Sequence, residues 1–391
     1  MLVDELVDGA KGAALPLIRR DLDLSYGQVG LLASVPLLVG GFLELPLGVL
    51  AGQGRRRRLA ILGGGILFVL TLLGTASAGS FAVLMCTFVA FYPASGAFVS
   101  LTQAQLMDAW PERQAQVMAR WDLAGAVGAV AGPLLLTAVL ASGGGWRVGY
   151  LVLAGLAALV WLGAYLRDPE AAARGRPEAG NDRGAETEDG GNRADAKQPW
   201  RERAREIRTA LRNWGTLRWL LLTEVGDLLV DVFTGFLALY LVDVAHMTPA
   251  VAALAIAIRL GAALAGDAAL IVILERVSDL TVLRASAAAA ALLYPAFLLV
   301  PGVAVKLVVL AALSAVTAPW YPIVQARLYG SLPGRSSVAV TLSSAAGLAG
   351  GLGPLAVGLA AGAFGLSWAL SVLVVVPVAV LLVPGRARPR A

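Results

Sequence analysis

Residues 4–12 read DELVDGAKG, and residues 227–235 read DLLVDVFTG. Both stretches carry Asp, Leu, Val, Asp and Gly at the same relative positions, 223 residues apart. The correspondence continues in order, with Gln103, Pro111, Arg113 and Gly132-Pro133 matching Gln325, Pro333, Arg335 and Gly353-Pro354. Because the offset drifts by only two residues along this series, the second half of the chain is predicted to repeat the first.

The composition is that of an integral membrane protein. Of the 391 residues, 58% are hydrophobic and 15% are charged, whereas soluble domains average about 45–50% and about 25%. Cys86 is the one cysteine and His246 the one histidine, which predicts no disulfide and no metal site. The formal net charge of +5 lies in loops between apolar runs, which argues against nucleic-acid binding. The acidic opening residues do not resemble a cleavable signal peptide.

Apolar runs long enough to cross a bilayer recur along the whole chain. A helix needs about 20 apolar residues to cross a bilayer. Inside lipid, the backbone N–H and C=O groups must bond to one another, and outside a closed β-barrel only a helix achieves this. Eleven such runs occur, at 28–51, 59–77, 81–106, 118–141, 148–166, 217–241, 249–274, 282–300, 304–328, 337–360 and 367–383. A shorter run at 1–17 precedes them. The sequence predicts an all-α membrane protein of twelve transmembrane helices in two pseudo-symmetric six-helix bundles.

A polar segment separates the two halves. We expect an N-terminal half over 1–166, a linker over 167–216 and a C-terminal half over 217–391. The linker is poor in large apolar residues up to Lys197, which is typical of disorder. Residues 200–214 then alternate apolar positions with arginines at helical spacing. This pattern predicts a basic amphipathic helix on an anionic membrane surface, with a plain solvated helix as the alternative.

The short loops predict the orientation. One set of loops is rich in arginine, at Arg55 to Arg58, Arg113, Arg276, Arg284, Arg335, Arg386, Arg388 and Arg390. The other set carries mainly Arg19, Arg20 and Arg147, with aspartates among them. Since cytoplasmic loops are enriched in Lys and Arg, we expect both termini and the linker in the cytoplasm, and the protein in the cytoplasmic (inner) membrane.

Two short motifs accompany the repeat. Residues 48–58, GVLAGQGRRRR, follow the second predicted helix and resemble the loop motif G-x-L-a-D-r-x-G-r-r of the major facilitator superfamily. Gly128, Gly132 and Pro133 resemble the G-x-x-x-G-P motif of the family's antiporters. The chain thus resembles bacterial drug or metabolite transporters of this family. The resemblance implies a substrate site between the halves near the midplane and alternating access by rocking of the halves.

The chain departs from the family pattern at two places. Gly52 stands where the loop motif has its acid, so the charge latch that the family forms there is expected in the second half instead, at Glu275 and Arg276. The start of the chain also differs, since Met1 aligns with Glu224 although the seventh predicted helix begins near Thr216. The first helix is therefore expected to lack roughly seven residues relative to its mate. A truncated sequence, a misassigned start and a shortened first span are the alternative explanations.

Acidic residues inside the predicted helices are the main candidates for chemistry, because an ionised side chain in the bilayer costs a few kcal/mol. They lie on one face of each of two predicted helices, at helical spacing. The first helix carries Asp4 and Asp8 with Lys11 on this face, and the seventh carries Glu224, Asp227 and Asp231. By the resemblance, these faces line the central cavity. Asp8 and Asp231 are expected to bind protons or a cationic group of the substrate, whereas Asp4 and Asp227 have interfacial solvation as the alternative. Glu5 lies off the stripe.

Further candidates lie on other helices. Glu44 and Asp267 occupy equivalent positions of the repeat. We expect them to form a proton relay or gate between the halves, and a role in helix capping or helix packing is the alternative. Arg259 could neutralise Asp231 or hold an anionic group, and Trp320 and Tyr321 could form an aromatic cavity wall. Small-residue faces on the fifth and eleventh helices predict close helix packing and easy sliding, with local bends at the prolines. Their members are Gly125, Gly128, Gly132 and Pro133, and Gly347, Gly350, Gly353 and Pro354.

These observations predict a secondary active transporter of a small molecule. Proton-coupled efflux of an amphipathic or cationic compound is the leading hypothesis. A proton symporter that imports a metabolite, and a membrane sensor or scaffold that does not transport, are the alternatives. No nucleophile–base arrangement or phosphate-binding loop indicates an enzyme. The expected partners are the substrate, protons and the lipid bilayer, with no cofactor and a monomeric state.

Overall fold

The computed structural model describes residues 1–50, 55–110, 114–166, 208–209, 211–332, 342–343 and 346–382. Within these ranges, the backbone alone is described for residues 41, 44–50, 55–56, 104, 107–109, 114–117 and 119. The described residues are helical, with no strand among them. Most of the predicted linker, and most of the amphipathic helix predicted over 200–214, lie outside the described residues.

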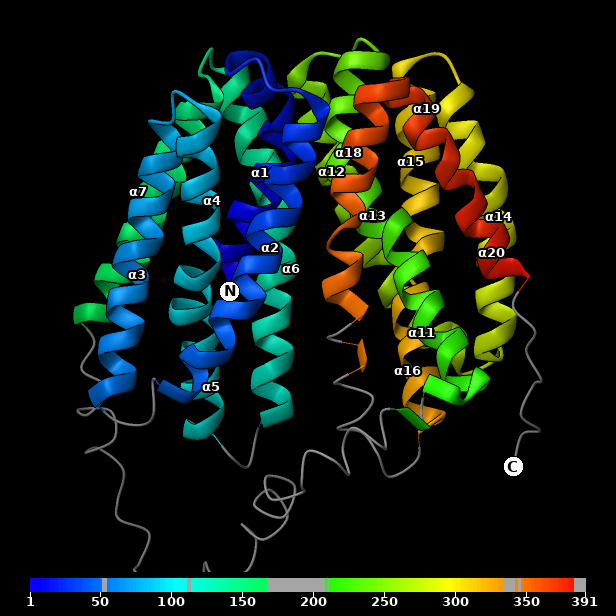
Figure 1. Ribbon diagram of the computed structural model, residues 1–391, viewed down its shortest axis with the longest axis horizontal. Coiled ribbons are helices and arrows are strands. Elements are labelled where there is room, and N and C mark those ends of the chain that lie inside the picture. Colours follow the sequence, from blue (N-terminus) through cyan, green and yellow to red (C-terminus); the bar gives the residue numbers. More distant parts are fainter. Residues whose placement is uncertain are drawn as a thin grey trace, which may run out of the picture.

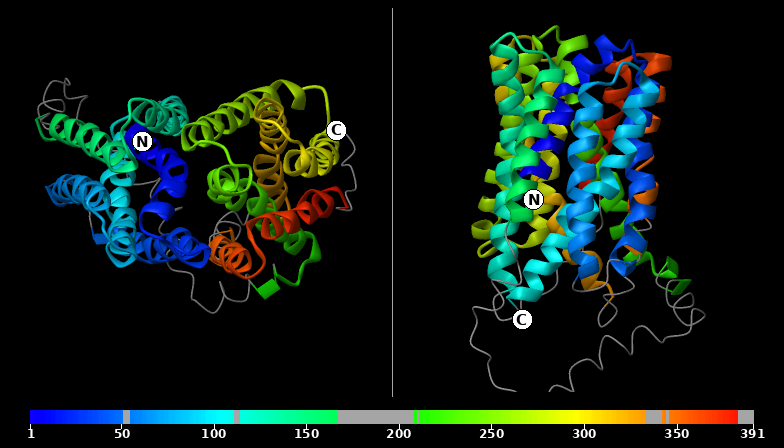
Figure 2. Two further views of the ribbon diagram at one scale, coloured as in Figure 1. Left: turned by 90° about the horizontal axis from the view of Figure 1, so that it is seen from above. Right: turned by 90° about the vertical axis from the view of Figure 1, so that its left-hand side faces the viewer.

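The helices form two groups that lie side by side (Figures 1 and 2). The N-terminal group comprises α1 (Leu2–Asp21), α2 (Tyr26–Leu50), α3 (Arg55–Ala76), α4 (Phe81–Ser95) continued by the π-turn η1 (Gly96–Ser100) and α5 (Leu101–Ala109), α6 (Gln114–Ala141) and α7 (Trp146–Leu166). The C-terminal group comprises α11 (Trp214–Asp227) continued by η3 (Leu228–Val232), α12 (Phe233–Leu239) and η4 (Tyr240–Val244), α13 (Pro249–Leu274), α14 (Asp279–Leu299), α15 (Val303–Thr317) with α16 (Trp320–Gly330), α18 (Gly353–Phe364), and α19 (Leu366–Ser371) with η5 (Val372–Val374) and α20 (Val375–Leu381).

The predicted set of twelve transmembrane segments is confirmed. Among the described residues nine helical segments are long and apolar enough to cross a membrane, and two shorter apolar helices cover Tyr26–Gly40 and Leu366–Leu381. Helix α1 is the twelfth and extends to Asp21, beyond the predicted end at residue 17. The N-terminus lies about midway along the bundle (Figure 1).

All helices run between two ends of the molecule (Figure 2, right). We name the linker end the one at which α7 finishes and α11 begins. The opposite end carries the α1–α2 and η4–α13 turns. Side chains at the preceding residue cap several helices: Ser80, Thr248 and Ser278 accept from the backbone N–H groups of Val83, Val251 and Thr281. Such caps satisfy orphan donors and set where each helix begins.

A small-residue surface on α6 lets α1 pack at short range. A Cβ atom at Gly128 would overlap the carbonyl oxygen of Leu2, and one at Gly132 would overlap that of Leu6. On the facing helix, a Cβ at Gly9 would overlap the carbonyl oxygen of Ala129. Since backbone stands directly opposite each glycine, no side-chain movement could make room. The two helices therefore touch backbone to backbone, as small-residue faces allow.

The C-terminal group contains a buried lysine that is held by backbone carbonyls. Lys306 of α15 is 5% exposed. Its Nζ donates to the carbonyl oxygens of Phe297 at 2.6 Å and Leu298 at 3.4 Å, and lies 5.0 Å from the Phe297 ring centroid. These carbonyls belong to the last turn of α14, where backbone acceptors lack partners and the helix dipole favours a cation. Lys306 thus ties the end of α14 to α15.

The backbone contact between α1 and α6 predicts an asymmetry between glycines. Gly132→Ala should lower the stability of the protein, by about 1–3 kcal/mol, because its methyl group requires the helices to separate. Gly155→Ala in α7 is the matched control, since no atom lies within 4 Å of a Cβ built there. Thermal unfolding of the detergent-solubilised variants, followed by tryptophan fluorescence, checks this. Equal midpoints for the two variants would contradict the described packing.

Candidate functional site

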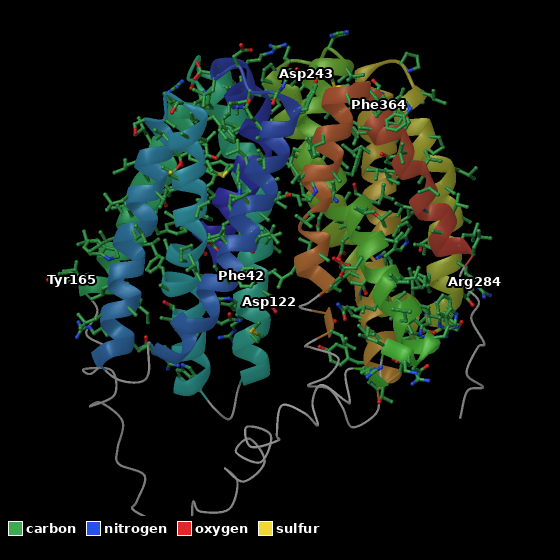
Figure 3. All side chains as sticks on the ribbon, viewed as in Figure 1. Phe42, Asp122, Tyr165, Asp243, Arg284 and Phe364 are labelled. Carbon is green, nitrogen blue, oxygen red and sulfur yellow. The ribbon has the colours of Figure 1, made fainter. Side chains whose placement is uncertain are left out.

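An ion pair joins the two halves at the end of the molecule opposite the linker end. Nη1 of Arg19, in the last turn of α1, lies 2.8 Å from Oδ2 of Asp243 in η4. The hydroxyl of Tyr26, the first residue of α2, donates to the same oxygen at 3.0 Å, and the Arg19 guanidinium lies 4.1 Å from the Tyr26 ring centroid. Asp243 is seen at this end in Figure 3. Three side chains thus connect the N-terminal half to the C-terminal half.

Below this ion pair, α2 and α18 continue the contact between the halves. A Cβ at Gly30 would overlap Pro354 and Leu355, and one at Gly358 would overlap Gly30. The hydroxyl of Ser34, which is completely buried, accepts a hydrogen bond from the backbone N–H of Leu355 at 3.0 Å. That N–H belongs to the first turn of α18, where it has no acceptor in its own helix.

The start of α18 reflects a break in the eleventh transmembrane segment. Residues 346–350 are helical, residues 351–352 form a turn, and α18 begins at Gly353 with Pro354 in its first turn. Proline at this position is favourable because its missing N–H would be unsatisfied anyway. The break frees a backbone donor for Ser34 of the other half. With the ion pair of Arg19 and Asp243, it closes the opposite end.

Asp8 lies in the second turn of α1 and its side chain is exposed. Protein surrounds it, because α1 packs against α6 and α7 of its own half and against α12 and α13 of the other. Its neighbours Leu6, Val7 and Ala10 are buried. Asp8 is therefore accessible to solvent although its helix lies against helices of both halves.

A cation accompanies Asp8. Lys11, one turn further along α1, interacts electrostatically with Asp8 and with Asp4. Its Nζ lies 4.7 Å from the ring centroid of Phe88 and 5.2 Å from that of Tyr92, both in α4. Ring faces attract a cation without neutralising it. Lys11 is thus held near Asp8 by contacts that persist whether or not the carboxyl is charged.

Two further acids lie close to Asp8 on α1. Oδ1 of Asp4 accepts a hydrogen bond from the Ser95 hydroxyl at 2.6 Å. Glu5, expected off the stripe, interacts electrostatically with both Asp4 and Asp8 and packs against Gly128 of α6. The sequence pattern missed Glu5 because a helical wheel marks angular position, whereas electrostatic reach depends on distance.

In the C-terminal half, Asp231 lies in the π-turn η3. Its side chain is exposed, as that of Asp8 is, although protein surrounds it on most sides. The carbonyl of Val230, in the same π-turn, accepts hydrogen bonds from Nη2 of Arg259 and from the hydroxyl of Thr234. The residue next to Asp231 thus anchors the adjacent cation.

Arg259 of α13 is buried and interacts electrostatically with Asp231. Asp227 interacts in the same way with Asp231 and with Glu224. Oε2 of Glu224 is enclosed and has no hydrogen-bond partner among the described residues, and a Cβ at Gly350 would overlap it. Each half therefore holds three clustered acids and one cation. In the N-terminal half the cation, Lys11, lies on the same helix as the acids. In the C-terminal half the cation, Arg259, lies on a neighbouring helix.

Other predicted residues are less engaged. Asp267 of α13 is exposed, whereas the side chain of its repeat mate Glu44, in α2, is not described. Of the loop motif, Gly48 ends up in α2 and Arg55 begins α3, whose first side chains are not described, and Gly52 lies outside the described residues. Glu275 and Arg276 follow α13 and are both exposed. At the same end, Asp279 and Arg327 form an ion pair.

The two aromatic candidates differ. Trp320 is 2% exposed, and its Nε1 donates to the hydroxyl of Ser286 in α14 at 3.0 Å. Trp320 therefore lies in the core of the C-terminal half and does not form the predicted cavity wall. Tyr321 is 56% exposed. Among the described residues, no group of three or more His, Cys, Asp and Glu side chains could hold a metal ion.

The sequence pattern of the Major Facilitator Superfamily matches residues 6–340. The chain belongs to this superfamily. Solved structures agree with the fold: a bacterial homolog of the human lysosomal transporter Spinster, inward-facing and unoccupied, is 17% identical with a TM-score of 0.75, covering 97% of this chain and 93% of that one. The nucleoside transporter NupG is 11% identical with a TM-score of 0.74, covering 97% and 95%.

Superfamily membership supports a multi-pass membrane transporter fold rather than an enzyme. At these identities the likeness to solved structures concerns the fold. The family's rocking of two halves nevertheless gives the ion pair at the opposite end a clear consequence. Any state of the molecule that opens this end must break the contacts of Asp243 with Arg19 and Tyr26.

Asp243→Asn should therefore favour opening of the opposite end. Hydrogen bonds to charged groups contribute about 1.5–3 kcal/mol, so the ratio of open to closed molecules should rise about tenfold. Spin labels on Ser142→Cys and Phe364→Cys, in a Cys86→Ser background, report the separation of the halves by pulsed electron paramagnetic resonance. Both positions are exposed at this end and lie in different halves.

Asp21→Asn is the matched control. It removes the same charge from the same end, but Asp21 pairs with Arg147 inside the N-terminal half. Its distance distribution should equal that of the parent. If Asp243→Asn also left the distribution unchanged, the ion pair between the halves would play no part in closure.

Proposed function

We propose that the protein is a secondary active transporter that exports a small amphipathic or cationic compound in exchange for protons. The observation that carries this proposal is the placement of Asp8 and Asp231. Both are exposed in the middle of the bundle, one from each half. Carboxyls so placed carry a cost that a purely structural role would not require.

The charges of the two clusters favour a cationic substrate. The first cluster contains Asp4, Glu5 and Asp8 against Lys11, and the second contains Glu224, Asp227 and Asp231 against Arg259. Acids outnumber bases in both. A cation is therefore attracted when the acids are ionised, whereas an anion is repelled.

Competition between substrate and protons supplies the coupling. Proton binding removes the charge that attracts a cation, so a carboxyl that holds a proton no longer holds the substrate cation. Lys11 and Arg259 stay in place during this exchange because aromatic rings and the Val230 carbonyl hold them. A site that binds either ligand but not both exchanges one for the other as the halves rock.

The orientation and organisation belong to the same proposal. The linker end carries the arginine-rich loops, so we place it in the cytoplasm with both termini, in the cytoplasmic (inner) membrane. The two transporting halves are residues 1–166 and 217–391, joined by 167–216, and the unit is a monomer. With the opposite end closed, the acids then face the cytoplasm, from which an exporter takes its substrate.

Proton flux in proteoliposomes with a pH-sensitive dye inside tests this function. A panel of amphipathic cations is added, and a substrate should change the internal pH. The double variant Asp8→Asn, Asp231→Asn should abolish that change. Asp23→Asn is the control, because Asp23 is exposed in the α1–α2 turn with φ +48°, a conformation that asparagine also tolerates.

The direction of the pH change separates the alternatives. Opposite movement of protons and substrate supports export by exchange, whereas movement in the same direction would identify a symporter importing a metabolite. Flux that survives in the double variant would overturn the assignment of coupling to Asp8 and Asp231. Substrate binding without any movement would favour a sensor or scaffold.

A further inference from the structure

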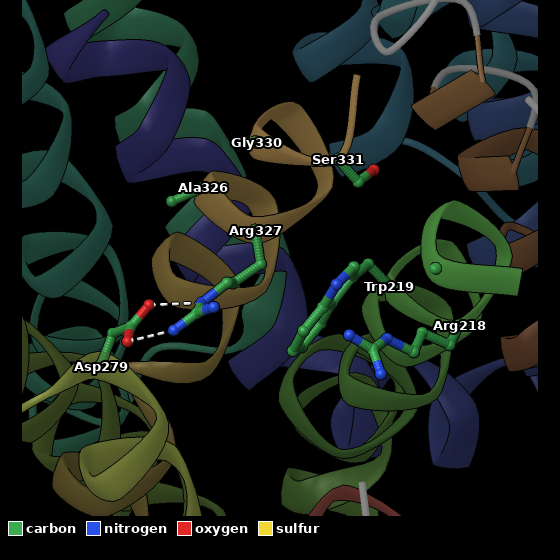
Figure 4. A pocket seen from close by; sticks show the side chains of 8 residues that line it. Arg218, Trp219, Asp279, Ala326, Arg327, Gly330 and Ser331 are labelled. Carbon is green, nitrogen blue, oxygen red and sulfur yellow. Dashed lines mark hydrogen bonds and ion pairs between the residues drawn. The ribbon is translucent and has the colours of Figure 1, made fainter. Parts of the chain in front are cut away.

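A polar cavity lies at the linker end of the C-terminal half, and none of the clustered acids lines it. It occupies about 430 Å³ between the starts of α11 and α14 and the end of α16 (Figure 4). The lining residues are Gly215, Arg218, Trp219, Asp279, Ala326, Arg327, Gly330 and Ser331. The cavity therefore contains two guanidinium groups, one carboxylate and one hydroxyl.

Arg327 is held in one orientation. Its Nε and Nη2 donate to the two carboxylate oxygens of Asp279, each at 2.5 Å (Figure 4). A bidentate pair of this kind restrains the planar guanidinium. It uses only part of the five N–H donors that arginine offers. The remaining donors are pre-oriented, because the pairing with Asp279 has already removed the freedom of the side chain.

The second guanidinium stands beside an aromatic ring. Arg218 lies 4.8 Å from the ring centroid of Trp219, and Arg327 lies 6.0 Å from the same centroid. Trp219 itself is 3% exposed. The indole therefore acts as a common platform for both arginines. Ser331 is positioned by hydrogen bonds of its hydroxyl with the carbonyl of Leu328 at 2.7 Å and the hydroxyl of Thr216 at 3.2 Å.

The charge of the cavity and its position in the fold favour an anion. Since Asp279 offsets one guanidinium, the lining carries one net positive charge. Exposed arginines also lie at this end of the molecule, outside the cavity lining: Arg208, Arg212, Arg276 and Arg284. The cavity also lies at the ends of transmembrane helices, which is the level of lipid headgroups. Arginine forks match phosphate oxygens in geometry, and basic pockets between transmembrane helices bind anionic headgroups.

We propose that this cavity binds a phosphate group, carried by an anionic phospholipid of the leaflet at the linker end. Arg218 and Arg327 contact the phosphate oxygens, and the apolar helix surfaces outside the cavity receive the acyl chains. This inference is independent of the transported substrate and of proton coupling.

Lipid binding by the full-length protein tests the proposal. Phosphatidylglycerol is titrated into the delipidated protein in detergent, and bound lipid is counted by native mass spectrometry, with phosphatidylcholine as the neutral comparison. Arg218→Gln should weaken phosphatidylglycerol binding at this site about tenfold, since hydrogen bonds to charged groups contribute about 1.5–3 kcal/mol. Arg284→Gln, which removes the same charge from an exposed position at the same end, should bind as the parent does.

Ala326→Glu is a second test variant. Unlike Arg218→Gln, it adds a charge and removes no existing contact. Ala326 is exposed in the cavity wall, so the added carboxylate should repel the phosphate while the fold is kept. Inorganic phosphate forms a separate arm. Protection against thermal unfolding by millimolar phosphate, lost in Arg218→Gln, would support the phosphate chemistry and assign it to a soluble ligand. Phosphatidylglycerol binding unchanged in both Arg218→Gln and Ala326→Glu would overturn the proposal.

Discussion

The constraint on which the rest of the structure depends is the cost of an ionised carboxyl inside a membrane. Asp8 and Asp231 can exist in mid-bundle only if protein and water, rather than lipid, surround them. Helix α1 accordingly lies between helices of both halves, and a cation stands beside each acid. Neither cation depends on the carboxyl alone: aromatic rings hold Lys11, and the Val230 carbonyl holds Arg259. The acids can therefore change charge without release of their neighbours.

Close backbone contact is the second requirement, since two halves that rock must meet without interlocking side chains. Glycines provide it at two kinds of interface. Within the N-terminal half, Gly128 and Gly132 bring α6 onto α1. Between the halves, Gly30 and Gly358 bring α2 onto α18, and Ser34 adds the hydrogen bond to the broken start of α18. The polar contacts that close the opposite end are few, which is consistent with an end that has to open during each cycle.

The sequence predicted the large-scale features well, for a physical reason. Lipid forces every span to be a long apolar helix, so hydropathy marks spans such as 249–274 directly, and the repeat fixes their pairing across the halves. The finer features depend on contacts that no local pattern encodes. The π-turn that carries Asp231 leaves the apolar pattern unchanged, and Arg19 and Asp243 read as ordinary loop charges until the fold brings them 2.8 Å apart. Trp320 was expected to line the cavity, but the Ser286 hydroxyl that holds it in the core is 34 residues away.

The central claim is that the acids of the two halves face one solvent-filled space that opens at the linker end and is closed at the opposite end. Cysteine accessibility tests this claim directly. Asp8→Cys and Asp231→Cys, each in a Cys86→Ser background, are exposed to a membrane-impermeant thiol reagent in sealed vesicles of either orientation. Both cysteines should react when the reagent is applied from the linker end and stay protected from the opposite end. Reaction of neither cysteine from either side, or equal reaction from both sides, would contradict the account.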